Sequence, residues 1–336
     1  MRRRKKQNTR SVSEAGVALL TVLLMLAAMS AIAVAIMDQV RFDIRRSVNV
    51  RLRDQAYWYA LGGEIFAQQI IEMGAGISPG RTTLNEQWAK EPVRLPLDNG
   101  SIAIGASDGG NCFNLNSVVD RAENGTLSSR ELGIAQFIAL LRSQGITETD
   151  SQSLAHSLAD WIDSNTVPGR RGAEDYYYSG LRPSYRTGAT LLADVTELRA
   201  IKGFSEEVYL RVRPYFCAHP NDELSTININ TLREADAALL IMLVGSEQLS
   251  LVRAAELIER RPFDGYGRVE EFWADEVFAN YTPSEEIVGQ IALQTRYFNL
   301  RTEVVLDDTY FAMNSTFERE RAGTFKLVSR SFGLPE

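Results

Sequence analysis

Oxygen-bearing side chains are densest in one short segment of the chain. The group consists of Asp160, Asp163, Asn165, Glu174 and Asp175. Asp160 and Asp163 lie three residues apart and share one face of a predicted helix, and Pro168 and Gly169 predict a turn that returns the chain toward it. Carboxylate and amide oxygens are the hard ligands that Ca²⁺ takes, and without a cation the carboxylates would repel one another. The sequence therefore predicts a bound calcium ion at this turn.

Two other interpretations of this acidic segment stay open. In the first, the acids form a solvated turn with Arg170 and Arg171 as their partners. In the second, two carboxylates form a glycosidase-like pair, which requires one buried acid that stays protonated in a substrate cleft. Nothing in the sequence indicates such a cleft, and Trp161 suits a core position better than stacking on a ligand.

The chain contains two cysteines, Cys112 and Cys217, and two histidines, His156 and His219. In an oxidising compartment the cysteines are candidates for a disulfide, and the alternative is a pair of buried thiols. The histidines lie far apart and outside any CxxC or HxxxH pattern, which argues against a zinc site or a histidine-based catalytic pair. We expect no serine or cysteine to have a histidine nearby, and no glycine-rich phosphate loop is evident. We therefore expect that the chain is not an enzyme.

The N-terminal region has the pattern of a membrane segment behind a basic leader. Residues 17–37 are apolar except for Thr21 and Ser30, and six basic residues but only one acid precede them. The run is longer than the about 7–15 residues usual in a signal peptide and long enough to cross a bilayer as a helix. By the positive-inside rule the leader stays cytoplasmic, which predicts a single pass through the inner membrane and a periplasmic C-terminal domain. An ordinary signal anchor is the alternative.

The helical pattern continues beyond residue 37. Apolar residues step along one narrow face, at Val40, Ile44, Val48, Leu52, Ala56, Tyr59, Phe66 and Ile70. Charged residues lie between them, and no proline occurs from Val17 until Pro79. We expect one helix from Val17 to about Glu72, roughly 80 Å long. Its first half suits lipid and its second half suits packing on a domain.

Beyond this helix the pattern predicts strands on either side of a helical block. Residues 73–100 are rich in Gly, Pro and Asn and are expected to be a loop. Residues from about 128 to 294 are mainly helical in pattern. Strands are expected over residues 100–106, 111–118, 297–306, 310–317 and 324–330.

The C-terminal strands need partners from elsewhere in the chain. Asp307 and Asp308 predict a hairpin turn between the first two of them, but three strands alone do not make a stable sheet with a covered face. We expect them to pair with the strands near 100–118 and to lie on the helix at 40–72. The helical block then becomes an insertion between strands.

Residues 14–21 resemble the processing site of prepilins. Glu14-Ala15-Gly16 is followed by Val17-Ala18-Leu19-Leu20-Thr21. The resemblance implies cleavage between Gly16 and Val17 by a prepilin peptidase and N-methylation of Val17. Major pilins and pseudopilins carry Glu at the fifth mature position, where this chain has Thr21. The family that lacks this Glu is the K subunit, a minor pseudopilin of the type II secretion system, which this chain therefore resembles.

The acidic segment carries the same resemblance. The K family has the signature Asp-Trp-x-Asp-x-Asp followed by Gly-Ala-Glu-Asp-x-Tyr-Tyr, and residues 160–165 and 172–178 are similar to it. Asn165 stands where the signature has its third Asp. The substitution keeps an oxygen ligand but removes one charge, so a lower calcium affinity is expected.

The resemblance covers nearly the whole chain and implies an α+β fold. This is a type IV pilin-like fold, a long N-terminal helix packed on a small antiparallel sheet, with a large inserted all-α domain. The implied function is to cap the pseudopilus tip in complex with minor pseudopilins I and J, which supports protein export across the outer membrane. The expected division is a leader at 1–16, a transmembrane part at 17–37, the pilin-like helix and first strands at 38–120, the inserted domain at 121–296 and C-terminal strands at 297–336.

Charge and two further motifs bear on the alternative function. Without the leader the chain keeps 30 basic and 42 acidic residues, a formal net charge of −12, which argues against nucleic acid or anionic lipid as a partner. Residues 198–214 and 228–263 nevertheless resemble helix-hairpin-helix units, which bind DNA phosphates through a glycine-rich hairpin. After Gly245 the second glycine is missing and Glu247 is present. DNA binding in an uptake pilus is therefore the alternative, and a helical pair for protein contacts is preferred.

Overall fold

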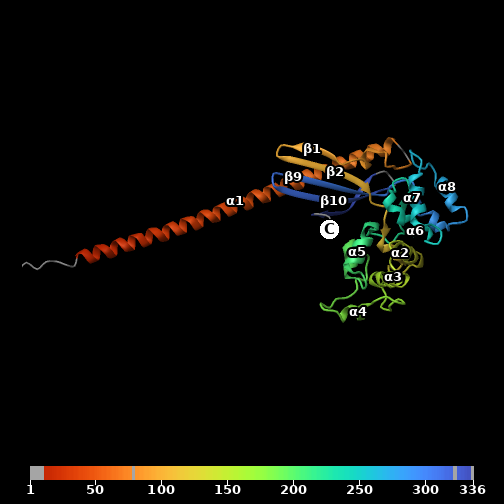
Figure 1. The fold of residues 1–336 in the computed structure, drawn as a ribbon, viewed down its shortest axis with the longest axis horizontal. Coiled ribbons are helices and arrows are strands. Elements are labelled where there is room, and N and C mark those ends of the chain that lie inside the picture. The colour runs from red at the N-terminus through yellow and green to blue at the C-terminus, as the bar shows by residue number, and fades with distance from the viewer. Residues whose placement is uncertain (1–10, 78–79, 321–323, 334–336) are drawn as a thin grey trace, which may run out of the picture.

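The computed structural model describes residues 11–77, 80–320 and 324–333, and its longest element is helix α1 (Figure 1). This helix runs from Ser11 to Ile77 without a break, which makes it roughly 100 Å long. The helix expected over residues 17–72 is therefore confirmed and extends further at both ends. Most of the predicted leader falls on residues 1–10, which lie outside the described residues.

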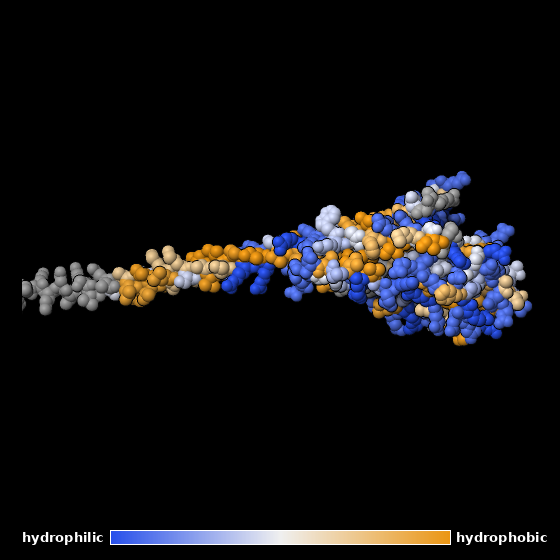
Figure 2. Space-filling view, turned by 90° about the horizontal axis from the view of Figure 1, so that it is seen from above, coloured by the Kyte–Doolittle hydropathy of each residue, from blue (hydrophilic) through white to orange (hydrophobic). Residues whose placement is uncertain are grey.

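The two halves of α1 have opposite surroundings. Every residue from 16 to 51 is exposed in the described chain. Figure 2 shows apolar side chains along the first part of the helix, followed by a hydrophilic stretch. The helix is long and apolar enough near its N-terminus to cross a membrane. Contact with the rest of the chain begins at Leu52, which is half-buried.

The buried stripe of α1 is made mostly of small residues. Its members are Ala56, Ala60, Gly63, Ala67 and Ile71. A Cβ atom at Gly63 would lie 2.9 Å from Cγ2 of Thr302, so glycine is needed for this close approach of helix to sheet. The expected apolar face is only partly right, because Tyr59 and Ile70 are half-buried whereas Phe66 is 39% exposed.

The sheet under α1 has five antiparallel strands. Their order is β1 (Val93–Leu97), β2 (Gly100–Asp108), β9 (Tyr297–Leu306), β10 (Thr309–Arg319) and β11 (Phe325–Phe332). The pairing of β2 with the C-terminal strands is confirmed, and so is the turn at Asp307, whose φ is 46°. Strand β1 lies inside the segment expected to be a loop. Its Pro96 is tolerated because β1 is an edge strand.

One carboxylate of α1 is buried in the interface with the sheet. Glu64 is 5% exposed and forms a two-point ion pair with Arg330 of β11, with Nη2–Oε1 at 2.6 Å and Nε–Oε2 at 3.1 Å. The hydroxyl of Ser315 on β10 donates to the same carboxylate. The hydrogen bonds that Arg330 donates to Glu64 raise the pKa of Arg330. Glu64 therefore ties two strands to the helix, and both of its oxygens have partners.

The strand expected at residues 111–118 is wrong over most of its length. Only Phe113 and Asn114 form a strand, β3, and Leu115–Val118 form a 3₁₀ turn. The side chain of Asn114 accepts a hydrogen bond from the backbone N–H of Asn116 and so caps the turn. This N–H is then not available to pair with a neighbouring strand. These residues lie in the core of the inserted domain. Phe113, Leu115 and Val118 therefore pack with the helical block although they precede residue 121, the expected start of the inserted domain.

The inserted domain is mainly helical and has its own hydrophobic core. Its helices are α2 (Glu131–Ser143), α3 (Glu148–Ile162), α4 (Asp175–Ser179), α5 (Glu206–Val212), α6 (Ala237–Val244), α7 (Leu251–Glu259), α8 (Val269–Trp273) and α9 (Glu285–Val288). Its short strands are β3 (Phe113–Asn114), β4 (Val119–Arg121), β5 (Leu127–Ser129), β6 (Phe216–Cys217), β7 (Ile227–Asn228) and β8 (Ile291–Ala292). Figure 1 places this domain at the end of the molecule away from the N-terminus of α1.

A half-buried aspartate lies where the chain leaves the sheet and returns to it. Asp108, at the end of β2, accepts hydrogen bonds from the backbone N–H groups of Gly110 and Asn111 at 2.8 and 3.2 Å. Its other oxygen accepts from the hydroxyls of Thr231 and Thr295. Burial raises the pKa of Asp108 above its usual value. The four donors come from both sides of the junction, so this carboxylate fixes the inserted domain to the sheet.

Candidate metal site

Helix α3 positions the first two predicted ligands. Thr147 caps its N-terminus by accepting a hydrogen bond from the backbone N–H of Asp150, and an apolar face anchors the helix in the core. Asp160 lies in the last turn, and Asp163 is the C-cap residue. Both side chains are only 2% exposed. Carboxylates this deeply buried require partners.

The loop after α3 folds back onto Asp160. The backbone N–H of Gly169 donates to both carboxylate oxygens of Asp160, at 3.0 Å each. At Gly172 a Cβ atom would lie 1.8 Å from Oδ2 of Asp160, so no larger residue fits there. The predicted turn at Pro168 and Gly169 thus does bring the loop back to the helix end. Burial still raises the pKa of Asp160, because these bonds only partly offset desolvation.

Asn165 lies beside Asp163 and is exposed. Its backbone N–H and its side-chain amide donate to the Asp163 carboxylate, at 3.2 and 2.7 Å. Its own oxygen accepts from the backbone N–H of Val167 at 2.7 Å. In this arrangement Asn165 closes a turn around Asp163, and its oxygen is already used. Burial raises the pKa of Asp163.

Glu174 completes a group of three buried acids. Its side chain is 5% exposed, and its Oε1 atom has no hydrogen-bond partner. Burial, followed by the charges of Asp160 and Asp163, raises the pKa of Glu174 to about 7. An unpartnered carboxylate oxygen beside two other buried acids is the local chemistry that a bound cation would satisfy.

Asp175, the fifth predicted ligand, faces another loop. Its Oδ1 atom accepts from the backbone N–H and the hydroxyl of Thr187, at 2.9 and 3.0 Å. Its other oxygen lies 3.9 Å from Nε of Arg186. The structure therefore brings Asp160, Asp163 and Glu174 together and gives Asp175 a separate role in the loop.

The alternative of a solvated turn with arginine partners is wrong for the three buried acids. Arg171 donates to the carbonyl of Thr149 and to Gln152, each at 3.4 Å, and forms no ion pair with Asp160, Asp163 or Glu174. The oxygens of the three carboxylates nevertheless do not lie close enough together to ligate one ion as they stand. Among the described residues, three His, Cys, Asp or Glu ligand atoms lie within 4.8 Å of one another at a different place in the fold. A cation would have to draw the carboxylates inward.

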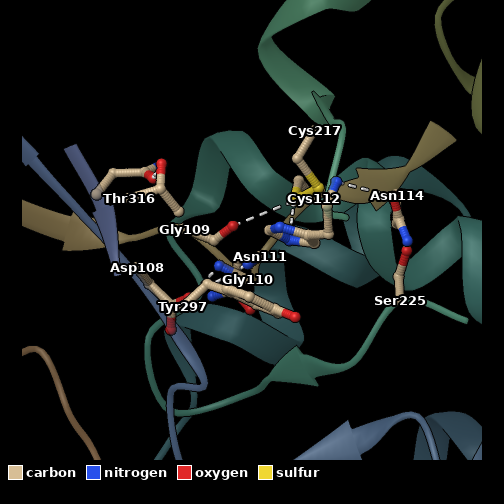
Figure 3. The surroundings of a disulfide bond; sticks show 12 residues. Asp108, Gly109, Gly110, Asn111, Cys112, Asn114, Cys217, Ser225, Tyr297 and Thr316 are labelled. Atoms are coloured by element: carbon tan, nitrogen blue, oxygen red, sulfur yellow. Dashed lines mark hydrogen bonds between the residues drawn. A yellow bond between two sulfur atoms is a disulfide. The ribbon is translucent and has the colours of Figure 1, made fainter. Parts of the chain in front are cut away.

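That compact group consists of Cys112, Cys217 and His219. The two cysteines form a disulfide with a Cα–Cα distance of 5.8 Å, one of the two alternatives that the sequence left open (Figure 3). Nε2 of His219 lies 3.7 Å from Sγ of Cys112. The expectation that no cysteine has a histidine nearby is therefore wrong, because the fold joins positions that lie 107 residues apart. The only signal in the sequence was that His219 follows Cys217 by two residues.

The second helix-hairpin-helix resemblance corresponds to helices α6 and α7. The hairpin between them begins at Gly245, which has φ of 88°, a conformation that favours glycine. All eight residues of α6 are buried. The pair is thus part of the domain core on the α6 side, and only α7 has an exposed face, which includes Val252 at 67% exposure.

Two family models match the inserted domain over most of its length. Two family models, each described as type II secretion system protein K, match residues 111–221 and 227–292. Type II secretion system protein K of Pectobacterium carotovorum subsp. carotovorum is 33% identical over 95% of this chain and 96% of its own length. The protein of the same name from Klebsiella pneumoniae is 32% identical over 95% and 96% of the two chains.

A solved structure has the same fold. It is the crystal structure of the GspK-GspI-GspJ complex from the type 2 secretion system of enterotoxigenic Escherichia coli. The matching chain is 27% identical, with a TM-score of 0.76, and the match covers 86% of this chain and 100% of that chain. Three observations indicate the same family: the pilin-like arrangement of α1 and the sheet, the inserted helical domain, and the relatives that match over nearly their whole length. The chain therefore belongs to the family of type II secretion system protein K, and it is a minor pseudopilin of the secretion machinery.

Proposed function

We propose that this chain caps the tip of the pseudopilus in a complex with minor pseudopilins I and J. The observation that carries the proposal is the position of the inserted domain, at the end of the molecule opposite the exposed half of α1 (Figure 1). A filament grows by packing such helices side by side, so a bulky domain at this end obstructs a further subunit. The solved relative was crystallised with GspI and GspJ, which supports these two partners.

The residue at position 21 supports a terminal position in the filament. The hydroxyl of Thr21 donates to the carbonyl of Ala18, one turn earlier in its own helix, at 2.9 Å. Its polar group is therefore satisfied without a neighbour. A glutamate at this depth in a membrane or filament would need a partner charge from another subunit. A subunit with nothing above it has no such requirement.

The exposed half of α1 supports insertion in the inner membrane before assembly. We propose that the leader stays cytoplasmic, that residues from about 38 onward lie in the periplasm, and that prepilin peptidase cuts between Gly16 and Val17. We also propose that Val17 is N-methylated after this cleavage. N-terminal mass spectrometry of the mature protein should give a methylated Val17 as the first residue. A first residue other than Val17 would refute this processing.

Calcium binding at the buried acids completes the proposed function. The fit rests on the unpartnered oxygen of Glu174 and on the burial of Asp160 and Asp163. These carboxylates would hold the ion, with Asn165 able to add its amide oxygen if its side chain turns over. Bound calcium would neutralise the cluster and hold the loop against α3. It would act as a structural ion.

The tip position can be tested with photo-crosslinking residues in the full-length chain. One is placed at Val48, on the exposed half of α1, and one at Phe263, which is 85% exposed and whose carbonyl accepts from Asn85 beyond the end of α1. We expect Val48 to crosslink to pseudopilins I and J and Phe263 to crosslink to no pseudopilin. Crosslinking of Phe263 to the major pseudopilin would mean that a subunit stacks above, and would refute the cap.

The calcium proposal can be tested with a pair of glycine variants. Gly172→Ala places a methyl group against Asp160, whereas Gly180→Ala, at the C-cap of α4, meets only an ordinary contact of 3.4 Å. We expect Gly180→Ala to bind calcium like the unmodified chain and Gly172→Ala to lose binding, measured by calorimetric titration of the full chain in detergent. Absence of calcium binding by the unmodified chain would overturn the proposal.

A further inference from the structure

We infer that the dithiol form of Cys112 and Cys217, together with His219, binds a thiophilic divalent cation of the zinc class, and that disulfide formation expels this cation. The inference concerns a different place from the acidic cluster. It rests on three ligand atoms, two Sγ and one Nε2, that all lie within 4.8 Å of one another. Figure 3 shows the two cysteines of this site beside the chain segment from Asp108 to Asn114.

The backbone holds these residues in place independently of the sulfur–sulfur bond. Strands β3 and β6 pair in parallel, so Asn114 lies opposite Cys217. The side chain of Asn114 accepts from the backbone N–H of His219 at 3.1 Å, and the amide of Asn116 donates to the His219 carbonyl at 2.8 Å. The His219 ring stacks on Tyr297, with ring centroids 3.8 Å apart. Reduction of the disulfide would leave all of these contacts intact.

The spacing matches a tetrahedral metal. Zinc bonds of about 2.3 Å to sulfur and about 2.0–2.1 Å to nitrogen place two tetrahedral ligands about 3.6 Å apart. Sγ of Cys112 lies 3.7 Å from Nε2 of His219. Once the sulfurs are no longer bonded, rotation of the cysteine side chains supplies a similar spacing between them. Two thiolates and one imidazole select zinc-class cations over calcium or magnesium, and the fourth position stays open to water.

Oxidation of the metal-bound dithiol replaces two metal–sulfur bonds with one sulfur–sulfur bond. Binding of the cation to the dithiol forms two metal–sulfur bonds and releases one proton from each thiol. A protein disulfide of the thiol–disulfide exchange class then removes two electrons from the two thiolates. The Cys112–Cys217 bond forms, the metal–sulfur bonds break and the cation leaves. The oxidant becomes a dithiol by taking up two protons from solvent. The cation would therefore hold β3 and β6 together between export of the chain and its oxidation.

Cobalt(II) is the probe for this site, because cobalt bound to sulfur is coloured. The full-length chain in detergent is reduced with a phosphine and titrated with Co²⁺ in the presence of excess calcium, which occupies the acidic cluster. We expect a sulfur-to-cobalt charge-transfer band and intense tetrahedral bands at one cobalt per chain. Both should disappear on adding zinc. The oxidised chain should give neither band.

Variants separate a folded site from two loose thiols. Cys112→Ser with Cys217→Ser should abolish the bands. His219→Ala should weaken cobalt affinity at least about tenfold, whereas His156→Ala, at the only other histidine in the chain, should leave it unchanged. A reduced chain without a charge-transfer band would overturn the inference. So would a band that His219→Ala leaves unaffected, since an unfolded dithiol would behave in that way.

Discussion

Glu64 and Glu174 are equally buried, each 5% exposed, yet they have opposite surroundings. Glu64 lies between the pilin-like helix and sheet, where Arg330 and Ser315 satisfy both of its oxygens. Glu174 lies in the inserted domain beside Asp160 and Asp163, and one of its oxygens has no partner. The first carboxylate has all its partners within the chain, whereas the second lacks one that the proposed calcium ion would supply.

The difference separates the part of the molecule that must be rigid from the part that responds to its surroundings. The pilin-like unit packs on other helices and gains from a fixed helix-to-sheet distance, which Gly63 and the Glu64 ion pair provide. The inserted domain carries its unpaired charge on a loop that closes over Asp160. If calcium binds there as proposed, the local stability of the inserted domain depends on calcium concentration and pH.

The largest effect is expected from removing the complete carboxylate. Glu64→Ala leaves the half-buried Arg330 guanidinium without its partner, and the free energy of unfolding should fall by about 3 kcal/mol. The measurement is chemical denaturation of the full chain in detergent. Glu72→Ala, at an exposed position on the same helix, is the matched control and should change stability by less than about 0.5 kcal/mol.

A double-mutant cycle shows whether that loss comes from the ion pair. If it does, Arg330→Ala added to Glu64→Ala should cost clearly less than the sum of the two single variants. Strictly additive losses would mean that the two side chains act separately, and the contrast between the two glutamates would no longer hold.

Calcium binding beside Glu174 should raise the free energy of unfolding by slightly less than Glu64→Ala lowers it. At a free concentration about 100-fold above its dissociation constant, a ligand that binds only the folded chain adds about 2.7 kcal/mol. Thermal denaturation with and without calcium measures this gain. Glu174→Gln should remove most of it, whereas Glu64→Gln should leave the gain in place even though the variant itself is less stable. An equal calcium response in both variants would place the ion elsewhere.

Without calcium, the same two substitutions should have opposite signs. Glu174→Gln removes a charge that Asp160 and Asp163 repel, so it should raise the free energy of unfolding by about 1 kcal/mol. Glu64→Gln weakens the ion pair with Arg330 and should lower it. The comparison uses calcium-free protein prepared with a chelator. Destabilisation by both variants would mean that Glu174 has a partner in solution that completes its hydrogen bonds.

The sequence predicted most of what periodicity and turn chemistry control. The long proline-free helix, the pairing of residues 100–106 with the C-terminal strands and the turn at Asp307 follow from local patterns, and the structure has all three. The strand over 111–118 failed because Asn114 accepts a hydrogen bond from the backbone N–H of Asn116, and Asn116 accepts one from the backbone N–H of Leu192, 76 residues away. Single-sequence periodicity does not register such bonds.

The contacts that the sequence missed are non-local. Arg330 lies 266 residues from Glu64, and His219 lies 107 residues from Cys112. Nothing in the spacing of either pair indicates a contact, since both depend on how the sheet and the inserted domain are assembled. At the acidic cluster the sequence named Asp160, Asp163 and Glu174, which converge. It also named Asp175, whose bonds to Thr187 only the folded loop reveals.

The smallest expected effect is a pH dependence that belongs to Glu174. Its pKa is about 7 in the folded chain and 4.5 in the unfolded chain, so the folded state binds more protons between these values. The stability linked to this group is fully present below about pH 4.5 and is lost as the pH rises through about 7. The calcium-free chain should therefore lose stability from about pH 5 to pH 8 relative to Glu174→Gln, which has no proton to lose.

Because many other groups titrate in this range, the measured quantity is the difference between the melting temperatures of the two proteins at each pH. Saturating calcium should reverse the sign of that difference, since the cation binds the deprotonated carboxylate. A difference that stays constant across this range would mean that Glu174 is already neutralised in the folded chain.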